Sequence, residues 1–404
     1  MSSSNVSRNV KSNVDTEIFR RTYADINIES LVHNWDQIKK LAGGDRFICP
    51  MVKANAYGHG DLQVSATLEN EGAEVMGVCL IEEGLLLRAS GIKSDILVFN
   101  GFDKRGAEKI FEYQLTPVAS TWEQIHALES VADSPIKVHL KFDTGMNRIG
   151  FNADQAEKLQ DYFSKSRKLK LKAILTHLAK GEDAHLEDGL SSQQIRKFTE
   201  IMDYFKSHDI YQHILNSGGI AALATGKNKI LNQHKWGFRP GLMLYGYQPA
   251  AHFSEISLKP VMSLKSVVNN VRQIAKGETV SYGATWTAKR PSLIAVVPIG
   301  YADGVHRIIS NKSVALFAGK KVPIVGRVCM DFLMLDVTEV VLESEVDKYI
   351  EEEVVLFGSD EKNNFLSAEE MSVNANTIVW ETLTSVSYRV PRHFTGTSKG
   401  LRKL

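Results

Sequence analysis

The chain has 404 residues, 43% of them hydrophobic and 24% charged, with a formal net charge of +1. This balance indicates a globular protein of two domains, and it gives no electrostatic footprint for nucleic acid or an anionic membrane. No apolar run approaches the roughly 20 residues needed to span a bilayer. Three scattered cysteines, Cys49, Cys79 and Cys329, argue against a disulfide framework or a zinc site and favour a reducing, cytoplasmic location.

The first two thirds of the chain alternate short apolar runs with amphipathic segments. Residues 1–20 are rich in Ser and Asn, lack the apolar core of a secretory signal, and are predicted to be a flexible tail. Helix-like spacing follows at 30–43, 82–91 and 191–209, and strand-like runs lie at 47–53, 75–80, 95–101, 137–143, 171–178, 213–219 and 241–246. About eight strand–helix units over residues 21–256 predict an α/β fold, a (β/α)8 TIM-like barrel.

After about residue 255 the pattern changes to strands separated by turn residues. Apolar, β-branched runs lie at 261–274, 292–300, 313–326, 332–340 and 353–358. We therefore predict a mostly-β C-terminal domain over residues 257–404.

The stretch MVKANAYGHG, residues 51–60, raises the first functional question. Lys53 follows a predicted buried strand and precedes a turn, so it lies at a carboxyl strand end, where barrel active sites are built. A lysine in this position either points into solvent or acts as a Schiff-base amine for an aldehyde cofactor.

A pyridoxal 5'-phosphate (PLP) site needs two further features besides such a lysine. It needs a phosphate cup and a partner for the pyridine nitrogen. The run LNSGG at 215–219 offers Ser217 and glycine N–H groups near a helix start, and GFRPG at 237–241 offers Arg239. A helix cap and an exposed turn are the alternatives when each motif is taken alone.

Taken together, these motifs resemble those of the alanine racemases, in the same order. MVKANAYGHG is similar to that family's PLP-attachment motif, and the resemblance extends through LKFDTGMNRIGF, THLAKGED, HILNSGG, GFRPGLMLYG, VSYGATW and VGRVCMDF to SVSYRVPR. It covers the chain from about residue 23 to 394. It implies a PLP-binding barrel followed by a β domain, and an L-/D-alanine racemase that supplies D-alanine for peptidoglycan.

The resemblance assigns cofactor contacts residue by residue. Lys53 would hold PLP as a Schiff base, and Arg239 would face the pyridine nitrogen. A guanidinium only donates hydrogen bonds, so that nitrogen would stay unprotonated, which disfavours transamination. The remaining cofactor-binding assignments are Tyr57, Asn216, Ser217, Gly241, Leu242 and Trp380.

The resemblance also implies two acid/base groups on opposite faces of the substrate. Lys53 serves one face, and Tyr282 serves the other from the partner subunit of a homodimer. A tyrosine is a poor base at neutral pH without a stabilising neighbour, and His177 would hydrogen-bond it and relay to Arg239. Active sites would then be shared between subunits.

Substrate contacts follow from the same comparison. Arg148 would bind the substrate carboxylate, with Met330 and Asp331 contributed by the partner. Lys141 matches a lysine that many members carbamylate, which would give Arg148 an anionic neighbour. An ordinary ion-paired lysine is the alternative for Lys141. No metal site is predicted.

One position departs from the family pattern. Trp380 stands eight residues before Tyr388, where the family has a tyrosine that lines the entrance and binds phosphate. An indole donates but cannot accept a hydrogen bond, so the preference for alanine is expected to change. The alternatives are a racemase of broader specificity, for example for serine, and a non-catalytic PLP-homeostasis protein. A decarboxylase of related fold is disfavoured because it needs an acidic partner where Arg239 stands.

Overall fold

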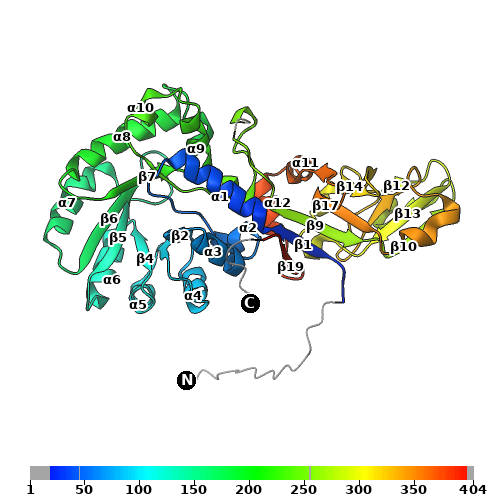
Figure 1. Cartoon of the computed structure of the whole chain (residues 1–404), viewed down its shortest axis with the longest axis horizontal. Helices are drawn as coiled ribbons and strands as arrows, with labels where there is room; N and C mark the ends of the chain where they lie inside the picture. The colour runs from blue at the N-terminus through cyan, green and yellow to red at the C-terminus, as the bar shows by residue number, and fades with distance from the viewer. Residues whose placement is uncertain (1–18, 45, 254–255, 398–404) are drawn as a thin grey trace, which may run out of the picture.

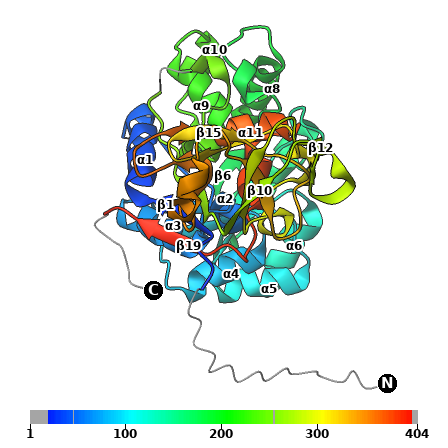
Figure 2. The ribbon, with the colours of Figure 1, turned by 90° about the vertical axis from the view of Figure 1, so that its right-hand side faces the viewer.

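The computed structural model describes residues 19–44, 46–253 and 256–397, which form a barrel and an adjoining mostly-β region (Figures 1 and 2). Within these ranges, no helix has the length and apolar character required to cross a membrane. The predicted flexible tail, except Phe19 and Arg20, lies outside the described residues.

The barrel wall is a parallel sheet of seven strands closed by one irregular segment. The strands run in the order β2 to β8, with bounds Val75–Val78, Asp95–Val98, Thr116–Ala119, Ile136–Lys141, Leu169–Leu175, Tyr211–Leu215 and Gly237–Phe238. Residues 47–52 close the gap, because Ile48 forms a parallel bridge to Phe238 and Met51 forms one to Gly77. Pro50 has no N–H to donate, so this segment forms isolated bridges and not a regular strand. The predicted (β/α)8 fold is confirmed.

Helices cover the outside of this sheet (Figure 1). The first, α1, starts after Asn27, whose side chain accepts a hydrogen bond from the N–H of Ser30, and ends at Gly43 in the left-handed conformation. The helices of this part of the chain are α1 Ile28–Ala42, α2 Lys53–Tyr57, α3 Asp61–Asn70, α4 Ile81–Ala89, α5 Lys104–Glu112, α6 Trp122–Val131, α7 Ala156–Lys165, α8 Leu190–Tyr204, α9 Ser217–Ala224 and α10 Lys229–Asn232.

The mostly-β region contains two main sheets. One has the order β15-β14-β17-β9-β1-β19 with β18 paired to β17, and the other has the order β10-β13-β16. Strand β1, Tyr23–Asn27, precedes the barrel in sequence but pairs with β9 and β19 in this region. The other elements are β9 Met262–Val267, β10 Asn270–Ile274, β11 Thr279–Val280, β12 Trp286–Thr287, β13 Ser292–Val297, β14 Val314–Phe317, β15 Lys320–Pro323, β16 Leu333–Asp336, β17 Glu353–Ser359, β18 Phe365–Leu366, α11 Ala368–Asn374, α12 Val379–Ser385 and β19 Arg392–Thr395.

Two predicted strands did not form, and one strand was missed. The run at 47–53 is the irregular closing segment with isolated bridges. The run at 241–246 is not a strand, because Leu242–Tyr245 forms a 3-10 helix that is buried on all sides. A short apolar run of this kind has no periodicity that separates strand from helix. Strand β4, Thr116–Ala119, was missed because it has four residues and contains Pro117.

Candidate active site

A pocket of about 860 Å³ opens at the carboxyl ends of the barrel strands. Helix α12 of the C-terminal region covers part of it through Trp380, Glu381 and Thr384, together with the N-cap residue Ile378. Eleven predicted site residues line this pocket: Lys53, Tyr57, Lys141, Arg148, His177, Asn216, Ser217, Arg239, Gly241, Leu242 and Trp380.

Lys53 begins an unusual turn of left-handed helix. The four residues from Ala54 to Tyr57 all have positive φ, between 51° and 55°, and none of them is glycine. Each such residue costs roughly 1–2 kcal/mol relative to the right-handed conformation. The surroundings must therefore hold the turn in place, and strain of this kind is common at functional sites.

Glu83, at the start of α4, is the main anchor of this turn. One carboxylate oxygen accepts a hydrogen bond from the N–H of Ala54 at 2.6 Å. The other accepts from the N–H groups of Cys79 at 2.7 Å and Leu80 at 2.9 Å. The carboxylate thus joins the lysine turn to the end of β2. The Asn55 side chain adds a second clamp, since it accepts from the N–H of Asp61 at 3.0 Å.

We expect Glu83→Ala to lower the free energy of unfolding by about 2 kcal/mol, because charge-assisted hydrogen bonds to strained backbone are lost. Urea unfolding measures the change. Glu82→Ala is the matched control, since Glu82 is an exposed carboxylate on the same helical turn, and it is expected to stay within about 0.5 kcal/mol of the parent. Equal effects of the two variants would contradict the anchoring role.

Close backbone contact fixes α12 over the lysine turn. A Cβ atom on Gly58 would lie 2.3 Å from the carbonyl oxygen of Leu383, so only glycine permits this approach. Arg392 Nε also donates to the carbonyl of Gly58 at 2.9 Å. Trp380 is brought to the pocket by this packing.

A polar cradle lies where β7 and β8 end. Asn216 caps α9 by accepting from the N–H of Gly219 at 3.0 Å, and Ser217 Oγ accepts from the N–H of Gly241 at 3.1 Å. A Cβ on Gly241 would lie 2.5 Å from the Tyr57 hydroxyl, so glycine is needed for the phenol to reach this point. Hydroxyls and helix N-terminal N–H groups are the donors that a phosphate group requires.

Arg239 lies at the bottom of the pocket in a dense set of acceptors. It donates to the carbonyl of Thr176 at 2.6 Å, to His213 Nδ1 at 2.9 Å and to His177 Nδ1 at 3.3 Å, and it also contacts the carbonyl of His213. Burial lowers the pKa of Arg239 to about 10, so the guanidinium stays protonated at neutral pH. It presents a fixed positive charge to the pocket.

The contact with Arg239 determines the tautomer of His177. Burial and then the charge of Arg239 hold the pKa of His177 well below its usual value, so the ring is neutral. Arginine only donates, so Nδ1 of His177 must accept and its proton must lie on Nε2. His177 is therefore a hydrogen-bond donor toward any partner beyond Nε2.

The amine of Lys141, at the end of β5, loses its proton more readily than that of an exposed lysine. Burial and the nearby charges of Arg148 and Arg239 lower the pKa of Lys141 to about 8. A larger neutral fraction at physiological pH favours reaction of the amine with an electrophile such as CO₂.

Three predicted residues do not line this pocket. Tyr282 lies in the β region with its side chain 72% exposed, and Met330 is also exposed. Asp331 forms an ion pair with Arg389 at 2.8 Å. A single chain therefore presents them on its surface, away from its own Lys53.

Sequence reasoning missed several residues that line the pocket or support it. Cys79 and Phe99 line it, and Glu83 supports the Lys53 turn; none of the three had a signal, because their roles depend on which strand ends meet in the barrel. His213 could have been suspected, since it lies three residues before the capping Asn216 in the quoted motif.

Comparison with known proteins places the chain in a family. Residues 26–249 match the model of the alanine racemase N-terminal domain, and residues 261–394 match that of the alanine racemase C-terminal domain. The chain belongs to the alanine racemase family, a family of isomerases. It is 38% identical over 387 residues to the alanine racemase of Sorangium cellulosum, covering 93% of this chain and 99% of that one. It is 36% identical over 381 residues to that of Carboxydothermus hydrogenoformans, covering 92% and 99%.

Solved alanine racemase structures are similar over nearly the whole chain. The Clostridium difficile enzyme has a TM-score of 0.83 at 30% identity, covering 94% of this chain and 97% of that one. The Bartonella henselae alanine racemase, described with covalently bound pyridoxal phosphate, has a TM-score of 0.80 at 29% identity, covering 93% and 99%.

Proposed function

We propose that this chain is a PLP-dependent racemase that interconverts L- and D-alanine by a two-base mechanism, supplying D-alanine for peptidoglycan. The observation that carries the proposal is the meeting, in one pocket, of Lys53 on its strained turn, a buried protonated Arg239, and the cradle of Tyr57, Ser217 and Gly241.

The residues present fit the cofactor. Lys53 would hold PLP covalently, the cradle would bind its phosphate, and Arg239 would donate to the ring nitrogen. When bound, PLP supplies a conjugated electron-withdrawing ring that acidifies the Cα–H bond of a linked amino acid. A guanidinium donates a hydrogen bond without giving up its proton, so the ring nitrogen that accepts from Arg239 would stay unprotonated. An unprotonated ring nitrogen favours inversion over transamination.

Proton transfer at the substrate Cα would involve two groups. The Lys53 amine, once free of the cofactor, removes or delivers the proton on one face, and the Tyr282 phenol of the partner subunit does so on the other. The Nε2–H of His177 would donate to the phenolate oxygen of that tyrosine and stabilise it. This arrangement requires a homodimer, and it would explain why Tyr282 is exposed on a single chain, since the side chain would enter the partner's pocket.

Substrate binding falls to Arg148 in the pocket, with Met330 and Asp331 of the partner. Carbamylation would turn Lys141 from a cation into an anion beside Arg148, which would hold the guanidinium in place. The lowered pKa of Lys141 supports this assignment.

The test of the function is exchange at the α-position. The purified protein with added PLP is incubated with L-alanine in D₂O, and products are followed by NMR and chiral chromatography. Deuterium at Cα together with D-alanine is the expected result. Exchange with serine but not alanine would support the second candidate, a racemase of different specificity, and the absence of exchange with any amino acid would overturn the proposal.

Trp380 is the residue that bears on the choice between alanine and serine. Its indole lines the pocket and is bulkier than the tyrosine of the family pattern, so it narrows the space for a substrate side chain. Trp380→Tyr is expected to raise the ratio of kcat/KM for serine to that for alanine by about tenfold, since pocket-shape changes have effects of this size. Trp380→Phe separates ring size from the added hydroxyl. An unchanged ratio in both variants would show that the side chain at position 380 does not set the preference between serine and alanine.

A further inference from the structure

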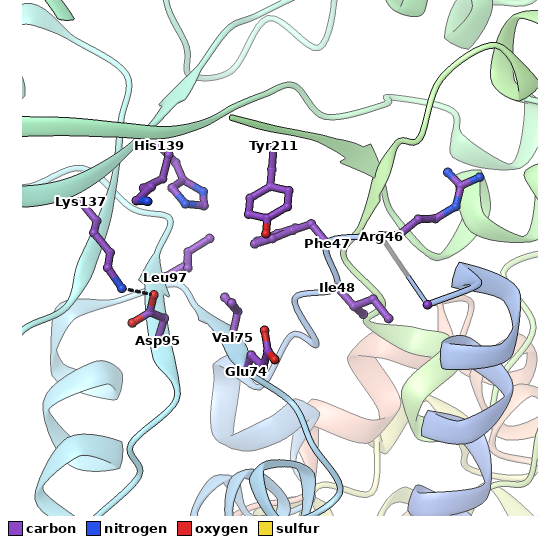
Figure 3. Close-up of a pocket in the computed structure, with 12 residues that line it drawn as sticks. Arg46, Phe47, Ile48, Glu74, Val75, Asp95, Leu97, Lys137, His139 and Tyr211 are labelled. Carbon is purple, nitrogen blue, oxygen red and sulfur yellow. Dashed lines mark hydrogen bonds and ion pairs between the residues drawn. The ribbon is translucent and has the colours of Figure 1, made fainter. Parts of the chain in front are cut away.

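A second cavity, of about 390 Å³, lies at the opposite end of the barrel from the candidate active site (Figure 3). It is formed where the barrel strands begin: Glu74 precedes β2, Asp95 begins β3, and Lys137 and His139 are the second and fourth of the six residues of β5. Its size lies in the range of small-molecule sites. None of the residues in the proposed racemase mechanism lines it.

The charges around this cavity are unbalanced in favour of cations. Arg46, Lys137 and Lys172 line it, against the carboxylates of Glu74 and Asp95. Lys137 and Asp95 neutralise each other, because Lys137 Nζ lies 2.7 Å from Asp95 Oδ2 (Figure 3). Arg46 lies at the edge of the cavity, where it donates to the carbonyl of Trp236 at 3.2 Å, and its guanidinium points away from His139 (Figure 3), so it contributes charge and not a hydrogen bond. The cavity thus retains an excess positive charge.

His139 adds a neutral donor whose orientation follows from a row of hydrogen bonds. Arg239 donates to His213 Nδ1 at 2.9 Å, and His213 Nε2 lies 2.9 Å from His139 Nδ1. Burial holds the pKa of His213 well below its usual value and lowers that of His139 to about 3, so both rings are neutral. Because Arg239 only donates, His213 carries its proton on Nε2 and donates to His139 Nδ1.

The remaining proton of His139 must therefore lie on Nε2. His139 lines the cavity, and its Nε2 has no hydrogen-bond partner among the residues the structure describes. Nε2 is not one of the fully buried polar atoms without a partner, so it is open to the cavity. Its N–H can therefore donate to an acceptor group in the cavity, and the excess positive charge would favour an anionic one.

We propose that this cavity binds a small oxyanion, held by the Nε2–H of His139 and the positive charge of Lys172, with Arg46 adding positive charge at the edge of the cavity. The oxyanion is a phosphate or a carboxylate group. Phosphate is expected to bind more tightly because it carries more charge and more acceptor oxygens.

The test is calorimetric titration of the PLP-loaded protein with inorganic phosphate at constant ionic strength. Loading with PLP fills the phosphate cradle of the active site, so binding there does not contribute. The expected result is saturable binding of one phosphate per chain, weakened about tenfold in Lys172→Met. The matched control is Lys170→Met, because Lys170 is an exposed lysine two residues earlier on β6 that does not line the cavity. Arg46→Gln serves as a second cavity variant should Lys172→Met fold poorly.

Three results would overturn the proposal. One is the absence of saturable binding. Another is equal weakening by Lys170→Met and Lys172→Met, which would indicate general charge screening. The third is tighter binding of acetate than of phosphate, which would contradict the charge argument. None of these readouts uses racemase activity, and Lys172→Met, which alters this cavity alone, separates binding here from binding at the active-site cradle should PLP fail to load.

Discussion

Replacement of Lys53 by alanine is expected to reduce the rate of alanine α-proton exchange by at least about 10⁴-fold, because one side chain both holds the cofactor and serves as a base. The variant should also fail to retain PLP after borohydride reduction, whereas the parent should carry a reduced adduct on the peptide that contains Lys53. Mass spectrometry of the digested protein measures this directly.

Lys170→Ala is the control for this experiment, since Lys170 is an exposed strand lysine outside the pocket. It should keep both the adduct at Lys53 and the activity. Circular dichroism of Lys53→Ala checks that the fold survives, which is expected because the anchors of the turn are Glu83 and Asn55. A reduced adduct on another lysine would show that the cofactor assignment is wrong.

Tyr282→Phe is expected to lower kcat by about 10² to 10⁴-fold, the usual contribution of a positioned acid/base group. Binding of PLP should be unchanged, because Tyr282 does not line the pocket that contains Lys53. The visible spectrum and the kinetics together separate a lost base from a lost cofactor.

Mixing the two inactive variants tests whether active sites are shared. In a hybrid dimer of Lys53→Ala and Tyr282→Phe chains, one site would combine an intact Lys53 with the partner's intact tyrosine. Random exchange gives hybrids in half of the dimers with one working site of two, so about a quarter of the parental activity should return, by the statistics of a symmetric dimer. If each chain used its own tyrosine, every site would lack one group and no activity would return.

The dimer itself stays a prediction, but the geometry of one chain agrees with it. Tyr282 and Met330 are exposed apolar side chains on the β region, and clusters of such side chains on a protein surface mark interaction sites. Analytical ultracentrifugation of the parent protein, done before the mixing experiment, establishes whether exchange between subunits can occur.

Much of this protein could be predicted from its sequence, because the relevant signals are local. The strand–helix alternation and the change to β texture near residue 255 depend on neighbouring residues, whose propensities act over one or two turns. The motifs around Lys53, Ser217 and Arg239 are equally local, and all three side chains line one pocket.

Only the tertiary structure decided which residues support those motifs. Glu83 acts on the Lys53 turn because β2 and the 47–52 segment are neighbours in the closed barrel, and β1 joins the C-terminal sheet through pairing over more than 200 positions in the chain. The row from His177 through Arg239 and His213 to His139 forms because β5, β7 and the segments that directly follow β6 and β8 place these side chains inside one barrel. Such contacts depend on chain closure and packing, for which a linear sequence has no local signal.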